Sequence, residues 1–367
     1  MTNLILTTPL QARIIEAIEQ AGSWLGFDTF MSMALYTPGL GYYANDLRKF
    51  GLMPGGATEA GSDFVTAPEM SPRFGQALAR QIAEAFRATG TKEVWEFGAG
   101  SGALAEKLLQ ALPQIARYTI VDLSGSLRGR QQQRLKAFEA RVDWAASLPD
   151  HMQGVVIGNE VLDAMPVKLL ARIDNTWHER GVVLNGDAFA FADQITLLRP
   201  PFEVVGTHDY LTEIHPQAEG FIRTLADKLD VGAIFMIDYG FPEHEYYHSQ
   251  RSMGTLVCHR AHQVDADALA DVGYKDITAH VNFTGIALAG QEAGLEVLGY
   301  TGQGRFLLNC GVLDDMEHAT IKDRTMVQKL INEHEMGELF KVIAFGAKNA
   351  AVWQPMGFAS GDRTHTL

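Results

Sequence analysis

Residues 94–104 of this chain read Val-Trp-Glu-Phe-Gly-Ala-Gly-Ser-Gly-Ala-Leu, and this stretch decides the fold. A short apolar run that contains one acid stops at a Gly-x-Gly-x-Gly turn. Apolar residues at helical spacing, Leu104, Leu108 and Leu112, follow the turn. Strand, glycine turn and helix in this order are typical of the first unit of a nucleotide-binding α/β domain. The stretch therefore predicts an α/β fold with a mostly parallel central sheet.

The acid and the glycines of this turn indicate which nucleoside it holds. Gly98, Gly100 and Gly102 permit positive φ and let a ligand approach the backbone. A dinucleotide site holds a pyrophosphate at this place, and the Glu96 carboxylate would repel it. The same carboxylate attracts the cationic methionine end of S-adenosylmethionine, which has no phosphate. A tight turn without a ligand is the alternative, because a glycine-rich turn is not specific by itself.

A second acid, Asp122, ends the next predicted strand. It lies 20 positions after Gly102, close to the ~20 expected of a carboxylate that binds ribose hydroxyls. Dinucleotide enzymes and methyltransferases share this feature. Asp122 therefore supports a bound nucleoside, and only Glu96 distinguishes between the two classes of enzyme. The alternative role for Asp122 is a helix cap, for which Ser124 serves equally well.

Composition excludes several classes of protein. The 367 residues are 47% apolar, which predicts a globular chain with a large core. We expect no transmembrane helix, because no apolar run reaches ~18 residues. The net charge of −14 without a basic run disfavours nucleic acid as a partner. Two cysteines without a metal motif, and a terminus (Met1–Leu6) unlike a signal peptide, favour a reducing cytoplasm and no metal.

Along the rest of the chain, helical and alternating patterns predict the other elements. We expect strands near residues 93–97, 118–122, 141–144, 155–157, 234–237, 255–258 and 305–312. We expect helices within residues 9–36, 71–90, 102–112, 124–140, 212–230 and 320–340. We expect a loop at residues 51–63, which are rich in glycine. Alternation within residues 166–200, with Asn185-Gly186 as a hairpin turn, predicts a β insertion.

Several motifs of the chain are similar to those of one known family. They are Gly41–Tyr43, Asp63–Glu69, Glu96–Gly102, Leu127-Arg128 with Arg130-Gln131, Asn159–Pro166, Asp238–Gly240, Asp276–Phe283 and Thr301–Gly304. Over most of its length the chain resembles the MidA-like class I methyltransferases. It departs from them at Ser62, where the family has glycine, and in a longer loop at Met53–Gly61. We also expect no mitochondrial targeting segment, as in a bacterial protein.

The resemblance implies a class I (Rossmann-like) methyltransferase fold with an N-terminal helical extension and a β insertion between the fourth and fifth strands. We expect a helical region and cofactor lid at residues 1–90. The core that binds S-adenosylmethionine is expected at residues 91–165 and 231–315. An insertion at residues 166–230 would form a substrate-side lobe, and residues 316–367 a final helix and tail. The sequence leaves the oligomeric state open.

The mitochondrial member of this family is a complex I assembly factor that dimethylates an arginine of a complex I core subunit. The resemblance thus implies a protein-arginine N-methyltransferase that uses S-adenosylmethionine and acts on a core subunit of respiratory complex I. The alternatives are a small-molecule methyltransferase, a non-catalytic assembly chaperone and an NAD-linked oxidoreductase. The intact set of acids and glycines opposes the chaperone, and Glu96 opposes the oxidoreductase.

Candidate cofactor residues lie at predicted strand ends and in the lid. They are Thr66, Pro68, Ser71, Glu96, Gly98, Gly100, Gly102, Asp122, Leu123, Trp144 and Asn159. The resemblance gives the lid role of Thr66, Pro68 and Ser71, with loop structure and helix capping as the alternative. Trp144 is placed to meet the adenine, or it is a core aromatic.

Glu160, Asp163 and His280 are the candidate catalytic residues. An arginine nitrogen is a poor nucleophile, because its lone pair is delocalised and its pKa exceeds ~12. Glu160 and Asp163, three positions apart, would hold the guanidinium between carboxylates if they start a helical turn. His280, near Asp276 and Asn282 in sequence, would remove the proton. A helix start stabilised by acids and a structural histidine are the alternatives.

Overall fold

The computed structural model describes residues 7–45, 66–122, 125–260, 263–348 and 353–367, which form two compact units. The core unit takes its described residues from 48–163, 218–243 and 280–367. It contains the glycine turn. The accessory unit takes its described residues from 1–47, 164–217 and 244–279.

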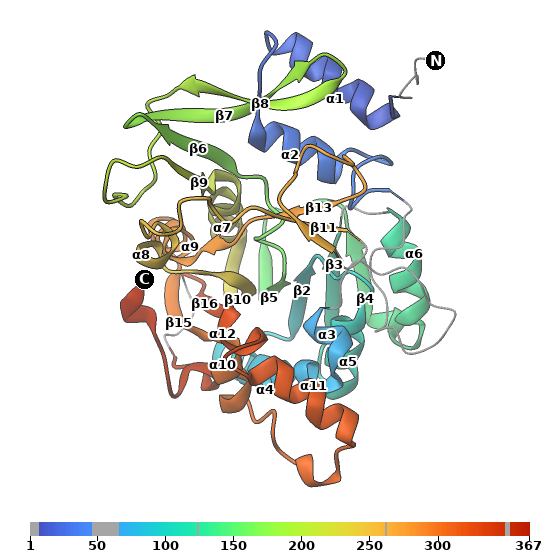
Figure 1. The fold of residues 1–367 in the computed structure, drawn as a ribbon. Helices are drawn as coiled ribbons and strands as arrows, with labels where there is room; N and C mark the ends of the chain where they lie inside the picture. The colour runs from blue at the N-terminus through green and yellow to red at the C-terminus, as the bar shows by residue number, and fades with distance from the viewer. Residues whose placement is uncertain (1–6, 46–65, 123–124, 261–262, 349–352) are drawn as a thin grey trace. The chain divides into compact units, whose positions relative to one another are not determined.

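The core unit is built on one sheet with the strand order β15-β16-β10-β5-β2-β3-β4 (Figure 1). Its five strands from β4 to β10 are parallel, whereas β16 and β15 are antiparallel to their neighbours. The strands are β2 (Glu93–Phe97), β3 (Arg117–Val121), β4 (Val142–Ala145), β5 (Met152–Asn159), β10 (Leu229–Phe241), β15 (Glu296–Gly302) and β16 (Phe340–Gly346), with the short β14 (Val281–Asn282) paired to β10. The order reverses direction between β2 and β5, which is where ligands bind in open α/β sheets.

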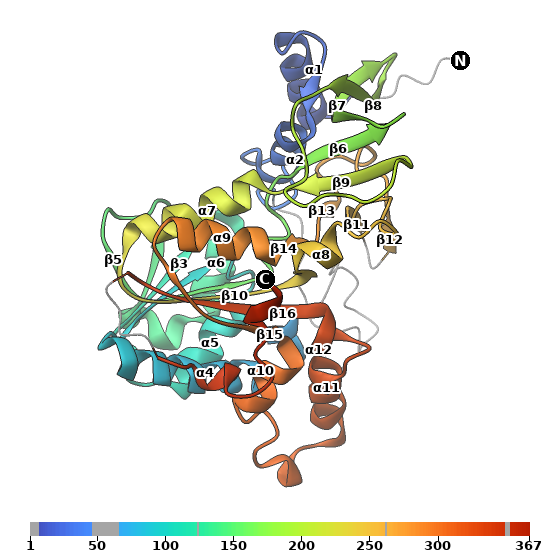
Figure 2. The ribbon, with the colours of Figure 1, turned by 90° about the vertical axis from the view of Figure 1, so that its left-hand side faces the viewer.

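Helices cover both faces of this sheet, with α4 and α5 on one face and α7 and α9 on the other (Figure 2). They are α3 (Ala67–Met70), α4 (Pro72–Thr89), α5 (Ala103–Ala111), α6 (Gly125–Arg134), α7 (Pro216–Lys228), α9 (Phe283–Glu292), α10 (Gln303–Asn309), α11 (Ile321–Ile331) and α12 (Met336–Leu339). Short 3-10 turns lie at Lys136–Arg141, Met316–His318, Met356–Phe358 and Thr364–Thr366. One apolar core runs between α4, α5 and the strands. The α/β class predicted from the glycine turn is confirmed.

Helix α4 shows how local sequence sets an element. Ser71 accepts a hydrogen bond from the N–H of Arg73 and caps the helix, and Pro72 occupies its first position. The helix ends at Gly90, whose φ of 70° lies in the left-handed region. The predicted start and end of this helix are both confirmed.

The prediction of a strand at residues 305–312 was wrong. These residues belong largely to α10, and the two antiparallel strands next to β10 are β16 and, at the edge, β15. A short apolar run such as Phe306-Leu307-Leu308 fits a buried helix as well as a strand, and its period does not separate the two. All seven residues of β16 are buried, which hides the alternation that marks a half-exposed strand.

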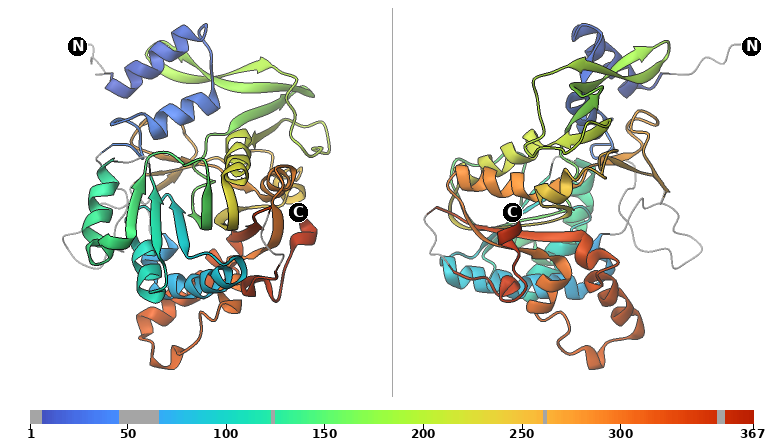
Figure 3. Two further views of the ribbon diagram at one scale, coloured as in Figure 1. Left: turned by 180° about the vertical axis from the view of Figure 1, so that it is seen from behind. Right: turned by 60° about the vertical axis from the view of Figure 1, so that its left-hand side comes forward.

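In the accessory unit, α1 (Pro9–Gln20) and α2 (Phe27–Tyr36) pack against an antiparallel sheet (Figure 3). The sheet contains β1 (Leu25–Gly26), β6 (Lys168–Ile173), β7 (Thr176–Asn185), β8 (Ala188–Ile195) and β9 (Tyr210–Ile214). Asn185 pairs with Ala188, so a hairpin turn joins β7 to β8 as expected. The chain continues through α8 (Glu243–Tyr246) to a small sheet of β11 (Val257–Arg260), β12 (Gln263–Asp265) and β13 (Asp276–Thr278).

Some expectations fall on residues that the structure does not describe. The loop at residues 51–63, the departure at Ser62 and the candidate Leu123 lie outside the described residues. In the part of the chain that is described, no helix has both the length and the apolar character needed to cross a bilayer.

Replacing Leu108 with alanine tests the core of the sheet's α5 face. Leu108 is fully buried, so L108A leaves a cavity and should lower the free energy of unfolding by about 3 kcal/mol. Urea denaturation followed by circular dichroism measures this loss. The matched control is Ile321→Ala in α11, because Ile321 is 85% exposed and its loss should cost less than about 0.5 kcal/mol. Equal losses in both variants would contradict the assignment of Leu108 to the core.

Candidate active site

The candidate residues of the core unit gather at the carboxyl edge of the parallel strands. Phe97 of β2 is in register with Val121 of β3 and with Gly158 of β5, and Asn159 is in register with Ile237 of β10. Residues that follow these positions in the chain must therefore emerge side by side (Figure 1). They are the glycine turn, Asp122, Glu160 and Asp238.

The glycine turn has the backbone that its sequence predicts. Gly98, Gly100 and Gly102 have φ of 63°, 52° and 81°, so each lies in the region that favours glycine. A Cβ on Gly98 would lie 3.0 Å from a methyl carbon of Val161. The turn thus brings bare backbone close to the loop after β5, as a cradle for a ligand requires.

Gln131 of α6 connects three of the positions around this turn. Its side-chain amide donates to the carbonyl oxygen of Gly100 at 3.0 Å and to Asp122 Oδ2 at 2.9 Å. Its Oε1 accepts a hydrogen bond from the indole N–H of Trp144 at 2.9 Å. Gln131 is fully buried. The structure therefore brings Gly100, Asp122 and Trp144 together through Gln131, which lies in one of the family motifs but was given no role from the sequence.

Glu96 is buried beneath the turn, with 3% of its surface exposed. The hydroxyl of Tyr118, on the neighbouring strand β3, donates to Glu96 Oε2 at 2.8 Å. Burial raises the pKa of Glu96 to about 8, against the lowering effect of the Tyr118 hydrogen bond. Glu96 therefore holds a proton at neutral pH until a cation lowers its pKa. The sequence did not indicate the part played by Tyr118.

The loop after β5 has an unusual backbone that one carboxylate holds in place. Glu160 has a φ of 56°, which is rare for a residue with a long side chain. Asp238 Oδ2 accepts the backbone N–H groups of Val161, Leu162 and Asp163 at 3.1, 2.9 and 3.2 Å. Because 75 or more residues separate these partners in sequence, no local pattern could have revealed this contact.

Asp163 and His280 meet in the core unit through Tyr239. The Tyr239 hydroxyl donates to Asp163 Oδ2 at 2.6 Å. Its ring lies edge-on to the His280 ring at 5.0 Å, and His280 stacks on Phe241 at 5.3 Å. Tyr239 thus contacts both Asp163, through its hydroxyl, and the candidate base His280, through its ring.

Three acids share this region, and their charges affect one another. Burial, and next the negative charges of Asp163 and Glu160, raise the pKa of Asp238 well above its usual range. A cation placed among the three would stabilise their charged forms. Asn159 adds a neutral acceptor, because its buried Oδ1 has no hydrogen-bond partner among the described residues while its amide donates to Glu160 Oε1.

Other candidates have structural partners. Ser71 caps α4, which was the alternative role for it. Asn282 caps α9 by accepting the Gly285 N–H, and both carboxylate oxygens of Asp276 accept from Tyr43 in the accessory unit. This last bond joins two of the motif segments of the sequence. Thr66 and Pro68 start the short helix α3.

The core unit fits S-adenosylmethionine by the chemistry of its groups. The turn offers uncharged bare backbone, Glu96 supplies a buried carboxyl beneath it, and Asp122 follows β3, the place at which such folds carry a carboxylate for ribose hydroxyls. Within the described ranges, no group of three or more histidine, cysteine or acidic residues is arranged to hold a metal ion.

Known proteins bear out this fit. A family model for S-adenosyl-L-methionine-dependent methyltransferases matches residues 77–301. The protein arginine methyltransferase NDUFAF7 of Xenopus laevis is 26% identical over 85% of this chain and 78% of that protein. Its Caenorhabditis elegans homolog is 23% identical over 98% of this chain and 92% of that protein.

A solved structure agrees with this result. A Burkholderia thailandensis protein crystallised with S-adenosyl-homocysteine is 47% identical over 98% of this chain and 96% of its own, with a TM-score of 0.91. Because the family model matches most of the chain and this relative holds the demethylated cofactor, the chain belongs to the family of S-adenosyl-L-methionine-dependent methyltransferases.

Proposed function

We propose that this chain is a protein-arginine N-methyltransferase and that its substrate is a core subunit of respiratory complex I. The observation that carries the proposal is the cluster of Glu160, Asp163 and Asp238, whose mutual repulsion a bound cation relieves. The relatives named protein arginine methyltransferase support the acceptor. The complex I subunit follows from the resemblance to the MidA-like family.

We assign the following residues to the cofactor in this proposal. They are Thr66, Pro68, Ser71, Glu96, Gly98, Gly100, Gly102, Asp122, Trp144 and Asn159. In this proposal Glu96 pairs with the methionine ammonium, because a cation lowers the pKa of a buried carboxyl and keeps it charged. Asp122 accepts from the ribose hydroxyls, and Gln131 holds Asp122 and Trp144 in place.

The proposed acceptor residues prepare the guanidinium for attack. S-adenosylmethionine supplies an electrophilic methyl group on a sulfonium. As the new nitrogen–carbon bond forms, the carbon–sulfur bond breaks and the guanidinium loses one proton. Glu160 and Asp163 hold the guanidinium through charged hydrogen bonds and draw its positive charge away from the attacking nitrogen. His280 receives the proton.

Replacing Glu96 with glutamine tests its assignment to the cofactor. The variant loses a charged partner of the ammonium, so the Kd for S-adenosyl-homocysteine at pH 7.5 should rise about tenfold or more. Isothermal titration calorimetry measures the Kd. Glu93→Gln, on the same strand, is the control and should leave the Kd unchanged. A wild-type Kd in E96Q would remove Glu96 from the cofactor site.

The same variant should change how stability depends on pH. The pKa of Glu96 is raised to about 8 in the folded protein, so its favourable contribution is complete below the unfolded value near 4.5. That contribution is lost as pH rises through 8. The melting temperature of ligand-free E96Q should therefore exceed that of the wild type by an amount that grows by about 3 °C from pH 5 to pH 8. Scanning fluorimetry measures it, and a pH-independent difference would contradict the burial argument.

Replacing Asp163 with asparagine separates acceptor binding from cofactor binding. Loss of one clamp carboxylate should lower kcat about 100-fold, while the Kd for S-adenosyl-homocysteine should stay within about twofold. Asp143→Asn is the control, because Asp143 lies exposed at β4 in an ion pair with Arg117. If D163N lost methyl transfer and cofactor affinity to the same degree, Asp163 would not be a substrate residue.

The substrate is tested directly with purified complex I subunits. Incubation with the chain and isotope-labelled S-adenosylmethionine should label arginine on the quinone-side core subunit, as read by mass spectrometry of peptides. The D163N variant serves as the blank. Label on other subunits with none on this one would exclude the proposed substrate.

A further inference from the structure

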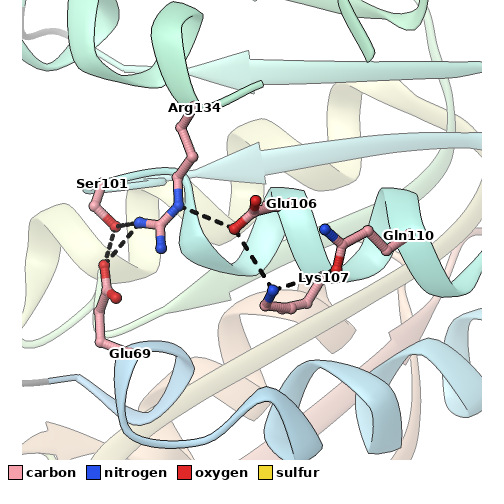
Figure 4. A network of polar contacts seen from close by, with 6 residues as sticks. All are labelled: Glu69, Ser101, Glu106, Lys107, Gln110 and Arg134. Carbon is pink, nitrogen blue, oxygen red and sulfur yellow. Dashed lines mark hydrogen bonds and ion pairs between the residues drawn. The ribbon is translucent and has the colours of Figure 1, made fainter. Parts of the chain in front are cut away.

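The glycine turn is tied to helix α3 by a polar network centred on Arg134 (Figure 4). Arg134, at the end of α6, donates from Nη1 to Ser101 Oγ at 2.7 Å and to Glu69 Oε1 at 3.0 Å. The Ser101 hydroxyl also donates to Glu69 Oε1. The three side chains form a closed triangle that joins α3, the turn and α6.

Arg134 has a second arm that leads away from this triangle. Its Nε donates to Glu106 Oε2 of α5 at 3.1 Å, and Lys107 lies 3.6 Å from the same carboxylate. Figure 4 shows the two arms on opposite sides of the guanidinium. The Nε arm connects α6 to α5 through Glu106. The Nη1 arm reaches Ser101 in the turn and Glu69 in α3. The two arms can therefore be tested separately.

The triangle of Arg134, Ser101 and Glu69 lies at the proposed cofactor turn. Ser101 lies between Gly100 and Gly102, whose backbone forms the proposed cradle. The Glu69 side chain is only 9% exposed, so its ion pair with Arg134 is screened less than a surface pair. Arginine suits this place because its planar guanidinium donates to two acceptors at once.

We propose that Arg134 and Glu69 are positioning residues that fasten α3 to the cofactor turn through Ser101 and thereby set how tightly the cofactor is held. The inference rests on the proposed cofactor role of the turn and does not depend on the methyl acceptor. The pair acts on binding: it keeps the turn backbone in the conformation that receives the ligand and leaves the methyl-transfer step unchanged.

The two arms of Arg134 provide the test. Glu69→Gln and Arg134→Met should each raise the Kd for S-adenosyl-homocysteine, and the KM for S-adenosylmethionine, about tenfold, with kcat within about twofold. Glu106→Gln should leave both within about twofold. In the double variant E69Q/R134M the loss of binding free energy should fall short of the sum of the two single losses, because Glu69 and Arg134 contact each other and share Ser101 as a partner. Arg134→Lys, which keeps the charge without the planar fork, should recover only part of the affinity.

Controls keep this result distinct from loss of folding and from failure of the site assignment. Melting temperatures of the ligand-free variants show whether each folds, and E69Q remains informative if R134M does not fold. Arg117→Met, which breaks an ion pair of 2.7 Å at the start of β3, controls for loss of an arginine. Wild-type Kd in E69Q with a weakened E96Q would overturn the inference alone. A wild-type Kd in both E69Q and E96Q would also overturn the assignment of the cofactor site. If E106Q and E69Q lost the same affinity for S-adenosyl-homocysteine, Arg134 would have only a structural role.

Discussion

A carboxylate in a protein interior is costly unless donors surround it, and this constraint shapes the carboxyl edge of the core sheet. Asp238 satisfies this requirement by accepting hydrogen bonds from the backbone N–H groups of the loop after β5. Asp163 meets it with the Tyr239 hydroxyl, and Glu96 with the Tyr118 hydroxyl. The acids are thus fixed in position by the donors they need, and the loop conformation depends on them in turn.

The same constraint predicts that this edge of the sheet favours cationic ligands. Glu96 has one hydroxyl donor and a pKa raised to about 8, so a cation is the partner that restores its charge. Asp238 is saturated by backbone donors and serves the loop. Of the buried acids at this edge, Asp238 therefore holds loop backbone, whereas Glu96 is the one that we propose attracts positive charge.

The sequence predicted those parts of the fold in which neighbours along the chain determine the structure. The turn between β2 and α5 and the cap at Ser71 depend on a few adjacent residues, and both appear as expected. Strand β16, which lies between β15 and β10, was missed because every residue of it is buried. In the site, strand-end acids could be found from their positions, since parallel strands end at one edge. Their donors could not, because Asp238 bonds to residues far away in the chain.

Gln131 shows how one amide can couple positions that appear separate in the sequence. The Trp144 indole is only a donor, so it must face Oε1, and this fixes the amide nitrogen toward the Gly100 carbonyl and Asp122. The orientation of the Gln131 amide therefore determines all three hydrogen bonds, to Gly100, Asp122 and Trp144. The Trp144 indole and the Gly100 carbonyl are thus linked through one amide, and a ligand that turned this amide over would break both hydrogen bonds.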